Sequence, residues 1–173
     1  MRSLARITSP ATTASTRSIT SPATACASGH AAASVGTLGV VTARGTIKGS
    51  LTTPDPVALQ RELAALADAG IEHLAIEASS HGLDQYRLDG LRLTAAAFTN
   101  LSRDHLDYHP TPAAYFAAKR RLFDQLLPAG GQAVLNADVP EFGALSEICR
   151  RRGIDVLDYG RKAQRLRKPF FES

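Results

Sequence analysis

The sequence predicts an α/β domain, a mainly parallel β-sheet flanked by helices. Two observations lead to this prediction. Short apolar segments alternate with segments of helical periodicity at the spacing of βαβ units. Prolines stand at the starts of the helical segments and glycines just beyond their ends, where helix boundaries favour them. The chain has 173 residues, 44% of them hydrophobic, which is enough for one domain with a buried core.

The elements follow one another as short strands and helices. In chain order we expect a strand at 34–41, a helix that opens at Pro54 and Pro56 and closes at Gly70, strands at 71–78 and 91–98, a helix at 112–127 before Pro128, a strand at 132–135, a helix at 139–151 before Gly153, and a strand at 154–159. The strand segments are largely apolar, as strands buried on both faces are. We therefore expect helices on both faces of the sheet.

Charge is distributed unevenly along the chain. The whole sequence has 20 basic and 16 acidic residues, a net charge of +4. Residues 1–54 contain no acidic residue, whereas residues 55–160 carry 15 acidic against 10 basic residues, a net charge of −5. The positive charge thus lies at the two ends of the chain. It does not indicate a nucleic-acid partner for the central part.

The ends of the chain differ in composition from the middle. Residues 1–33 are rich in Ser, Thr and Ala without hydrophobic periodicity, so we expect a disordered leader, with a transit peptide or a reading-frame artefact as alternatives. The predicted domain spans 34–167, and 168–173 form an unrelated tail. No apolar run is long enough to span a membrane. Cys26 and Cys149 lack metal-site spacing, which favours a reducing, cytoplasmic location.

Four polar clusters lie after predicted strands or on a helix: 51–56, 77–87, 99–109 and 114–123. In parallel sheets, ligands bind at the carboxyl ends of strands, so these clusters are candidate site residues. Each cluster also has a purely structural explanation. The first would cap a helix, the second would hold a salt-bridged Glu77, the third would be a solvated loop and the fourth a solvated helix face.

The residue types in these clusters favour metal and anion chemistry. Glu77 ends a strand apolar enough to be central, and a carboxylate there is costly unless it binds a metal or another partner. Two aspartates and two histidines within 104–109 offer further ligands, without a zinc spacing. Lys119 lies one helical turn from Phe116 and Phe123, and a lysine close to an apolar face is less readily charged and open to modification.

In this order and spacing, the clusters resemble the central domain of the Mur ligases. The resemblance runs from about residue 30 to 167 and rests on four motifs: Leu-Thr-Thr-Pro-Asp, Glu-x-Ser-Ser-His-Gly-Leu-x-Gln-x-Arg, Phe-Thr-Asn-Leu-Ser-Arg-Asp-His-Leu-Asp-Tyr-His and Tyr-Phe-x-Ala-Lys-x-x-Leu-Phe. It implies an ATP-dependent ligase of peptidoglycan precursor synthesis. The most similar type adds diaminopimelate or lysine to UDP-N-acetylmuramoyl-L-alanyl-D-glutamate.

The resemblance also assigns roles to residues. It implies that the UDP-muramoyl dipeptide is bound by Thr52, Thr53, Ser79, Gln85 and Arg87. It implies that Mg²⁺ is bound by three catalytic groups, Glu77, His105 and a carbamylated Lys119. Asn100 and Asp104 would lie near ATP. In the implied reaction, the D-glutamate carboxylate attacks the γ-phosphate of ATP, and the amino group of the incoming amino acid displaces phosphate from the acyl phosphate. A cytoplasmic monomer without membrane or nucleic-acid partners is expected.

The sequence departs from the family pattern at one important point. It contains no Gly-x-x-x-x-Gly-Lys-Ser/Thr loop, so the expected fold is like that of the P-loop NTPases but incomplete and without the phosphate loop. We therefore expect the isolated chain to lack ligase activity. Three alternatives are a non-catalytic module that binds the muramoyl peptide, a ligase like folylpolyglutamate synthase, and a decayed chain without a stable fold.

Overall fold

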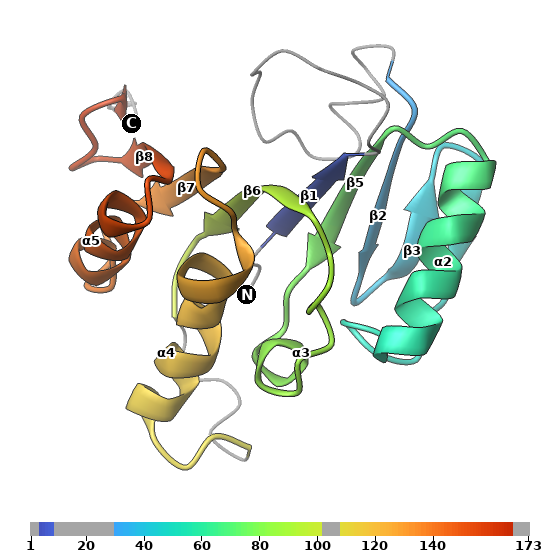
Figure 1. Ribbon diagram of the computed structural model, residues 1–173, viewed down its shortest axis with the longest axis horizontal. Helices are drawn as coiled ribbons and strands as arrows, with labels where there is room; N and C mark the ends of the chain where they lie inside the picture. The colour runs from blue at the N-terminus through green and yellow to red at the C-terminus, as the bar shows by residue number, and fades with distance from the viewer. Residues whose placement is uncertain (1–3, 9–29, 102–107, 168–173) are drawn as a thin grey trace, which may run out of the picture.

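The computed structural model describes residues 4–8, 30–101 and 108–167. They form a nine-stranded sheet in the order β4-β3-β2-β5-β1-β6-β7-β8-β9 (Figure 1). The strands are β1 (Leu4–Thr8), β2 (Ala32–Gly36), β3 (Gly39–Thr42), β4 (Gly45–Ile47), β5 (His73–Glu77), β6 (Leu93–Phe98), β7 (Gln132–Asn136), β8 (Asp155–Gly160) and β9 (Leu166–Arg167). The helices are α2 (Pro56–Asp68), α3 (Ser80–Asp84), α4 (Pro112–Arg121), the π-helix η1 (Leu122–Leu126) and α5 (Phe142–Arg151).

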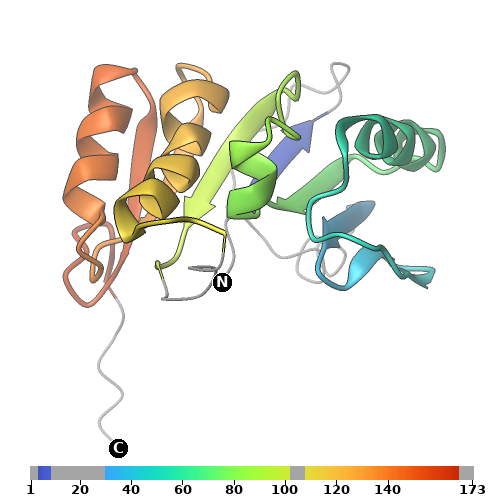
Figure 2. The same cartoon turned by 90° about the horizontal axis from the view of Figure 1, so that it is seen from below.

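The α/β architecture predicted from the sequence is confirmed. β2 pairs with β5 in parallel, and β6, β7, β8 and β9 form a second parallel group. Successive crossovers all move in the same direction along the sheet, so right-handed connections place the described helices on one face (Figure 2). The burial of alternate residues along β5 and β7 agrees with this arrangement. The sequence instead predicts helices on both faces.

The segment predicted as one strand, 34–41, is a hairpin. β2 and β3 pair antiparallel with Gly36 opposite Gly39, and the turn between them consists of Thr37 and Leu38. Gly39 has φ +88°, and a Cβ there would clash with the carbonyl oxygen of Ile47. Because only glycine fits this conformation and this close approach, the apolar run is divided at this point.

Strand β1 lies where the sequence predicts a disordered leader, 1–33. It occupies the position between β5 and β6 and is antiparallel to both. Without it, the facing edges of two parallel groups would leave their backbone N–H and C=O groups unpaired in the middle of the sheet. An extended segment at this position therefore supplies hydrogen-bond partners for both edges, and these edges face each other only in the assembled fold. The remainder of the leader, 9–29, and the tail, 168–173, lie outside the described residues.

Helix boundaries agree with the local signals. Asp55 caps α2, and its carboxylate accepts hydrogen bonds from the backbone amides of Val57 and Ala58, each at 3.0 Å. Gly70, with φ +79°, follows the end of this helix. Thr111 caps α4. The predicted helix 112–127 is confirmed over its length, but its last turn is a π-helix that ends with the amide of Leu127 bonded to the carbonyl of Leu122. Among the described helices, none combines the length and apolar character that crossing a bilayer requires.

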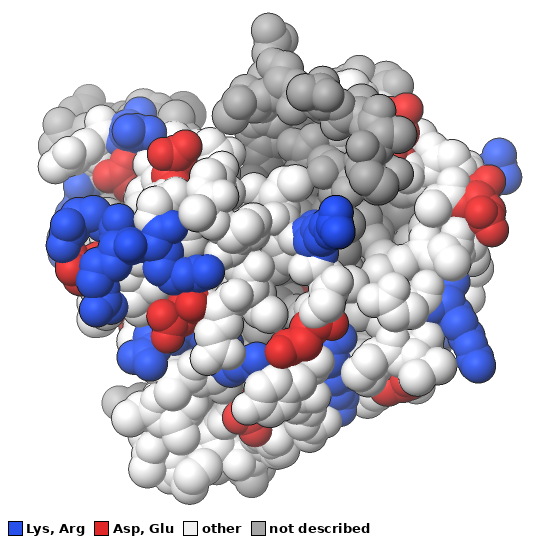
Figure 3. Space-filling model, in the orientation of Figure 1, with Lys and Arg blue, Asp and Glu red and all other residues white. Residues whose placement is uncertain are grey.

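Basic side chains gather over the end of α5 (Figure 3). Arg150 and Arg151 form ion pairs with Glu147 on the same helix, at 2.7 and 3.8 Å. Arg152 donates from Nη1 to the carbonyl oxygens of Phe123 and Leu127, each at 2.7 Å. Cations at a helix C-terminus also interact favourably with its dipole. This positive cluster is therefore explained by contacts within the fold.

Candidate functional site

Most of the candidate residues come together where β2 and β5 end. Glu77 is the last residue of β5, Ser79 caps α3 directly after it, and the segment with Thr52 and Thr53 passes beside both. α4 brings Lys119 to the same place. As expected for a parallel pair of strands, the site forms at their carboxyl ends.

The Glu77 carboxylate is held by the β2–β3 turn. Its Oε2 accepts hydrogen bonds from the backbone amide of Thr37 at 3.0 Å and from the Thr37 hydroxyl at 2.9 Å. The Thr37 and Thr52 hydroxyl oxygens lie 3.2 Å apart. Gly36 makes this approach possible, because a Cβ at that position would lie 2.7 Å from the same carboxylate oxygen. Carboxylate and hydroxyl oxygens together form a hard donor set, which fits Mg²⁺.

Thr53 organises the backbone of the site. Its side chain is buried, with 1% exposure. Its hydroxyl donates to the carbonyl oxygen of Glu77 at 2.8 Å, accepts from the amide of Ser79 at 3.0 Å, and lies 3.0 Å from the Ser79 hydroxyl. Ser79 in turn caps α3 by accepting from the amide of Gly82 at 3.0 Å. Thr53 is thus engaged within the protein, whereas Thr52 and Ser79 are partly exposed.

Gly82 is expected to be essential for this arrangement. A Cβ at Gly82 would lie 2.7 Å from two carbon atoms of Thr53. The substitution Gly82→Ala should therefore lower the free energy of unfolding by about 1–3 kcal/mol, measured by urea denaturation. Gly143→Ala is the matched control: a Cβ at Gly143, in α5, meets nothing within 4 Å. Equal stabilities of the two variants would contradict the close contact between α3 and Thr53.

Gln85 and Arg87 lie beyond α3 in a chain of polar contacts. Arg87 donates from Nη1 to the carbonyl oxygen of Thr53 at 2.7 Å and from Nε to Oε1 of Gln85 at 3.1 Å. The Gln85 amide donates to the Tyr108 hydroxyl at 3.2 Å, which donates to Asp84 at 2.8 Å. Gln85 is exposed and Arg87 half-buried, so both extend the site toward the surface.

Among the described residues of the site, Lys119 is the charged group whose pKa is shifted most. It is 3% exposed, and its Nζ donates to the carbonyl oxygen of Ala78 at 2.8 Å. Burial lowers the pKa of Lys119 to about 8, and attraction by the Glu77 carboxylate opposes this shift without cancelling it. A lysine with this pKa is partly neutral near pH 8, and the neutral amine is nucleophilic.

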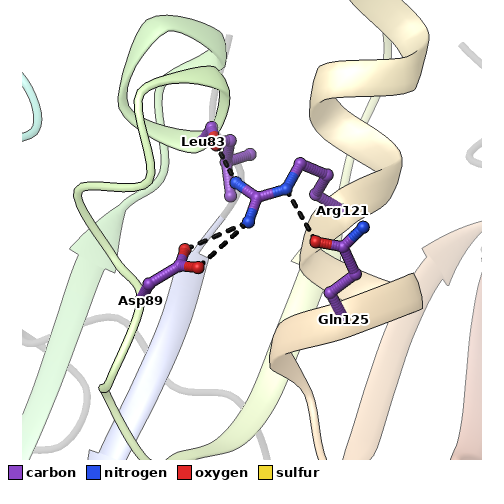
Figure 4. A network of polar contacts seen from close by, with 4 residues as sticks. All are labelled: Leu83, Asp89, Arg121 and Gln125. Atoms are coloured by element: carbon purple, nitrogen blue, oxygen red, sulfur yellow. Dashed lines mark hydrogen bonds and ion pairs between the residues drawn. The ribbon is translucent and has the colours of Figure 1, made fainter.

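Arg121 joins α4 to the segment that follows α3 (Figure 4). Its guanidinium donates to the carbonyl oxygen of Leu83, to both carboxylate oxygens of Asp89 at 3.1 and 3.2 Å, and to Gln125 at 2.9 Å. It also lies 4.0 Å from the centre of the Tyr86 ring. Since Gln85 and Arg87 lie between these anchor points, Arg121 fixes the loop that carries them.

The structure places most, but not all, of the predicted residues. Asn100 is exposed in the loop after β6. Asp104 and His105 lie outside the described residues. Neither Thr37 nor Arg121 is among the site residues predicted from the sequence. Thr37 lies in a turn that is not predicted, between two strands expected as one. Arg121 lies in a basic run typical of a solvated helix face. The glycines on either side of the Thr37 turn are the one sequence feature that points to either residue.

Comparison with known proteins gives a consistent result. Residues 12–172 match the family model described as the Mur ligase middle domain, beyond the predicted domain limits at both ends. The chain is 57% identical over 133 residues to a UDP-N-acetylmuramoyl-L-alanyl-D-glutamate--2,6-diaminopimelate ligase of Bradyrhizobium diazoefficiens, covering 77% of this chain and 27% of the relative. A protein of the same name from Rhizobium meliloti is 58% identical over 134 residues, covering 78% of this chain and 28% of the relative.

A solved structure shows the same likeness. It is titled as a UDP-N-acetylmuramoyl-L-alanyl-D-glutamate--2,6-diaminopimelate ligase and superimposes with a TM-score of 0.71 at 34% sequence identity. The match covers 80% of this chain and 28% of that one. The chain thus spans less than a third of the length of these relatives.

Proposed function

The chain belongs to the Mur ligase family, and from this premise we propose that it provides the dipeptide-binding and magnesium-binding part of a ligase site. The complete reaction would be the ATP-dependent addition of 2,6-diaminopimelate to UDP-N-acetylmuramoyl-L-alanyl-D-glutamate, the activity in the names of its relatives. The observation that carries the proposal is the convergence of Thr53, Glu77 and Lys119 at the end of β5.

Each residue has a role that its surroundings support. Arg87 and Gln85, at the outer part of the site, would bind anionic and amide groups of the dipeptide substrate, since a guanidinium forms strong charge-assisted hydrogen bonds with carboxylates and phosphates. Thr52 and Ser79 would add hydroxyl contacts. Thr53 would act as a positioning residue, because its hydroxyl is already bonded to Glu77 and Ser79.

Glu77 and a carbamate on Lys119 would hold Mg²⁺, together with His105. When bound, Mg²⁺ neutralises charge on the transferred phosphoryl group. In carbamylation, the neutral Lys119 amine attacks carbon dioxide, a C–N bond forms as the electrons of one C=O π bond move to oxygen, and the nitrogen releases a proton to solvent. The product is an anion close to the Glu77 carboxylate. Two neighbouring anions, one of them on the buried Lys119 side chain, repel each other, so we expect the carbamate to persist only with a cation between them. Asn100 and Asp104 would lie toward the nucleotide.

Carbamylation of Lys119 gives a direct prediction. The purified chain is incubated at pH 8.5 with carbon-13-labelled bicarbonate, and the carbamate signal is followed by NMR with and without Mg²⁺. We expect one carbamate per chain that Mg²⁺ strengthens and that Lys119→Arg abolishes, since arginine remains protonated. Lys162→Arg, at an exposed position, is the control and should retain the signal. A signal lost in Lys162→Arg and kept in Lys119→Arg would overturn the assignment.

Substrate binding tests the proposed function itself. In calorimetric titrations, UDP-N-acetylmuramoyl-L-alanyl-D-glutamate should bind the chain, and Arg87→Ala should weaken binding by about 10- to 100-fold through loss of a charge-assisted hydrogen bond. Arg92→Ala removes the same charge at an exposed position before β6, at the opposite ends of the parallel strands, and should bind like the wild type. Absence of binding to the folded wild-type chain would contradict the proposal.

The same titration separates the alternatives. Binding that ATP does not affect would favour a muramoyl-peptide module, in line with the missing phosphate-loop sequence. Binding of a folate substrate instead would favour the folylpolyglutamate-synthase-like alternative. A monomeric state and a cytoplasmic location remain predictions, which gel filtration and cell fractionation would test.

A further inference from the structure

A group of side chains that carry metal-ligand atoms lies at the opposite ends of the same strands. His73 is the first residue of β5, Glu72 precedes it, and His30 lies shortly before β2. Because β2 and β5 are parallel, their starts lie side by side, away from Glu77. One ligand atom from each of the three side chains lies within 4.8 Å of the others. We propose that His30, Glu72 and His73 bind one divalent transition-metal ion of the zinc class.

The backbone around these residues is fixed by the sheet. The amides of Glu72 and His73 both donate to the carbonyl oxygen of Ala31, at 2.9 and 3.1 Å. This pairing holds the segment containing His30 beside the start of β5. The two imidazole rings lie 4.8 Å apart between centroids, at an interplanar angle of 83°. The three ligands are therefore brought together by backbone structure that exists before an ion binds.

Binding requires only modest side-chain movement. Ligand atoms around a tetrahedral zinc ion are about 3.4 Å apart, given metal–ligand distances of 2.0–2.1 Å. The three side chains would have to approach one another by roughly an ångström or slightly more from the present spacing. His30 and Glu72 are exposed and His73 is half-buried, so rotation of the first two can provide this movement without disturbing the core.

The donor set selects the metal. Two imidazole nitrogens and one carboxylate oxygen suit Zn²⁺, Co²⁺ or Ni²⁺, whereas Mg²⁺ prefers oxygen ligands only. His30 also lines a pocket of about 460 Å³, bounded by Arg44, Ala69 and Ile71 among others, so solvent can reach this ligand. An ion held by three protein ligands would take water as its fourth ligand. An ion bound here would link the start of β2 to the start of β5. The site is separate from Glu77 and Lys119 and does not depend on the proposed ligase function.

Metal titration of the full chain tests the proposal. The metal-free chain is titrated with Co²⁺, followed by visible absorption, and bound Zn²⁺ is counted by equilibrium dialysis. We expect one Zn²⁺ per chain, a raised melting temperature, no competition by excess Mg²⁺, and affinity weakened about 100-fold in His30→Ala and in His73→Ala. Glu72→Gln keeps the shape of an exposed side chain, so its loss of affinity cannot be attributed to misfolding.

A histidine variant at the other site provides the matched control. His81, beside Tyr108 with ring centroids 3.8 Å apart, belongs to the region of the candidate site, and His81→Ala should leave zinc binding unchanged. Zinc binding that survives in His30→Ala, His73→Ala and Glu72→Gln would overturn the proposal. So would zinc binding lost only in His81→Ala, because the ion would then lie near the carboxyl ends of the strands.

Discussion

Raising the pH from about 8 to 10.5 should increase the contribution of Lys119 to the free energy of unfolding by about 3 kcal/mol. Burial lowers the pKa of Lys119 to about 8 in the folded chain, whereas the unfolded chain has the ordinary value of 10.5. Between these values the unfolded state binds more protons, so stability rises with pH. Below pH 8 both states are protonated, and the fold carries the full cost of a buried ammonium group.

The measurement is a series of urea denaturation curves for the wild type and Lys119→Met, without Mg²⁺ or bicarbonate. Cys149 acts in the opposite direction, because burial raises its thiol pKa from 9.0 to about 11, so stability falls between these values. This contribution is present in both proteins and cancels in their difference. Lys162→Met, at an exposed position, should show no such trend. A constant difference between the wild type and Lys119→Met across the range would contradict the lowered pKa.

The sequence predicts those parts of the fold that local interactions determine. Gly70 and Gly153 follow the ends of α2 and α5 with φ of +79° and +64°. This left-handed conformation ends a helix locally, whatever the direction of the chain after it. β1 could not be predicted in this way, because its place between β5 and β6 depends on pairing with segments more than 60 residues away. Its local composition favours no particular structure.

The same distinction applies to the site. The burial of Lys119 follows from its spacing to Phe116 and Phe123 on one helix face. Its bond to the carbonyl of Ala78 depends on how α4 packs against the end of β5, which no local pattern encodes. The sequence leaves Thr53 as either a helix cap or a ligand-binding residue. In the structure Asp55 caps α2, which leaves the Thr53 hydroxyl to join β5 to α3.

Replacing Arg121 by Ala should destabilise the fold by about 2–4 kcal/mol, because a partly buried guanidinium with several partners is lost and the carbonyl of Leu83 keeps only the longer hydrogen bond from the amide of Tyr86, at 3.3 Å. Arg121→Lys should recover only part of this energy, since an ammonium group cannot contact both oxygens of Asp89 in the same way. Urea denaturation measures both effects.

Arg120→Ala is the matched control for Arg121→Ala. Arg120 is the preceding residue and carries the same charge. Its one ion pair within the described part of the chain is an exposed contact with Asp124 at 3.7 Å, so its loss should cost less than about 1 kcal/mol. Arg121 anchors the loop on either side of Gln85, and we therefore expect Arg121→Ala, while still folded at low temperature, to bind the muramoyl dipeptide more weakly than Arg120→Ala. Equal stability and equal affinity of the two variants would show that the loop holds its conformation without α4. Lower stability with unchanged affinity would show that Arg121 supports the fold but does not position the binding residues.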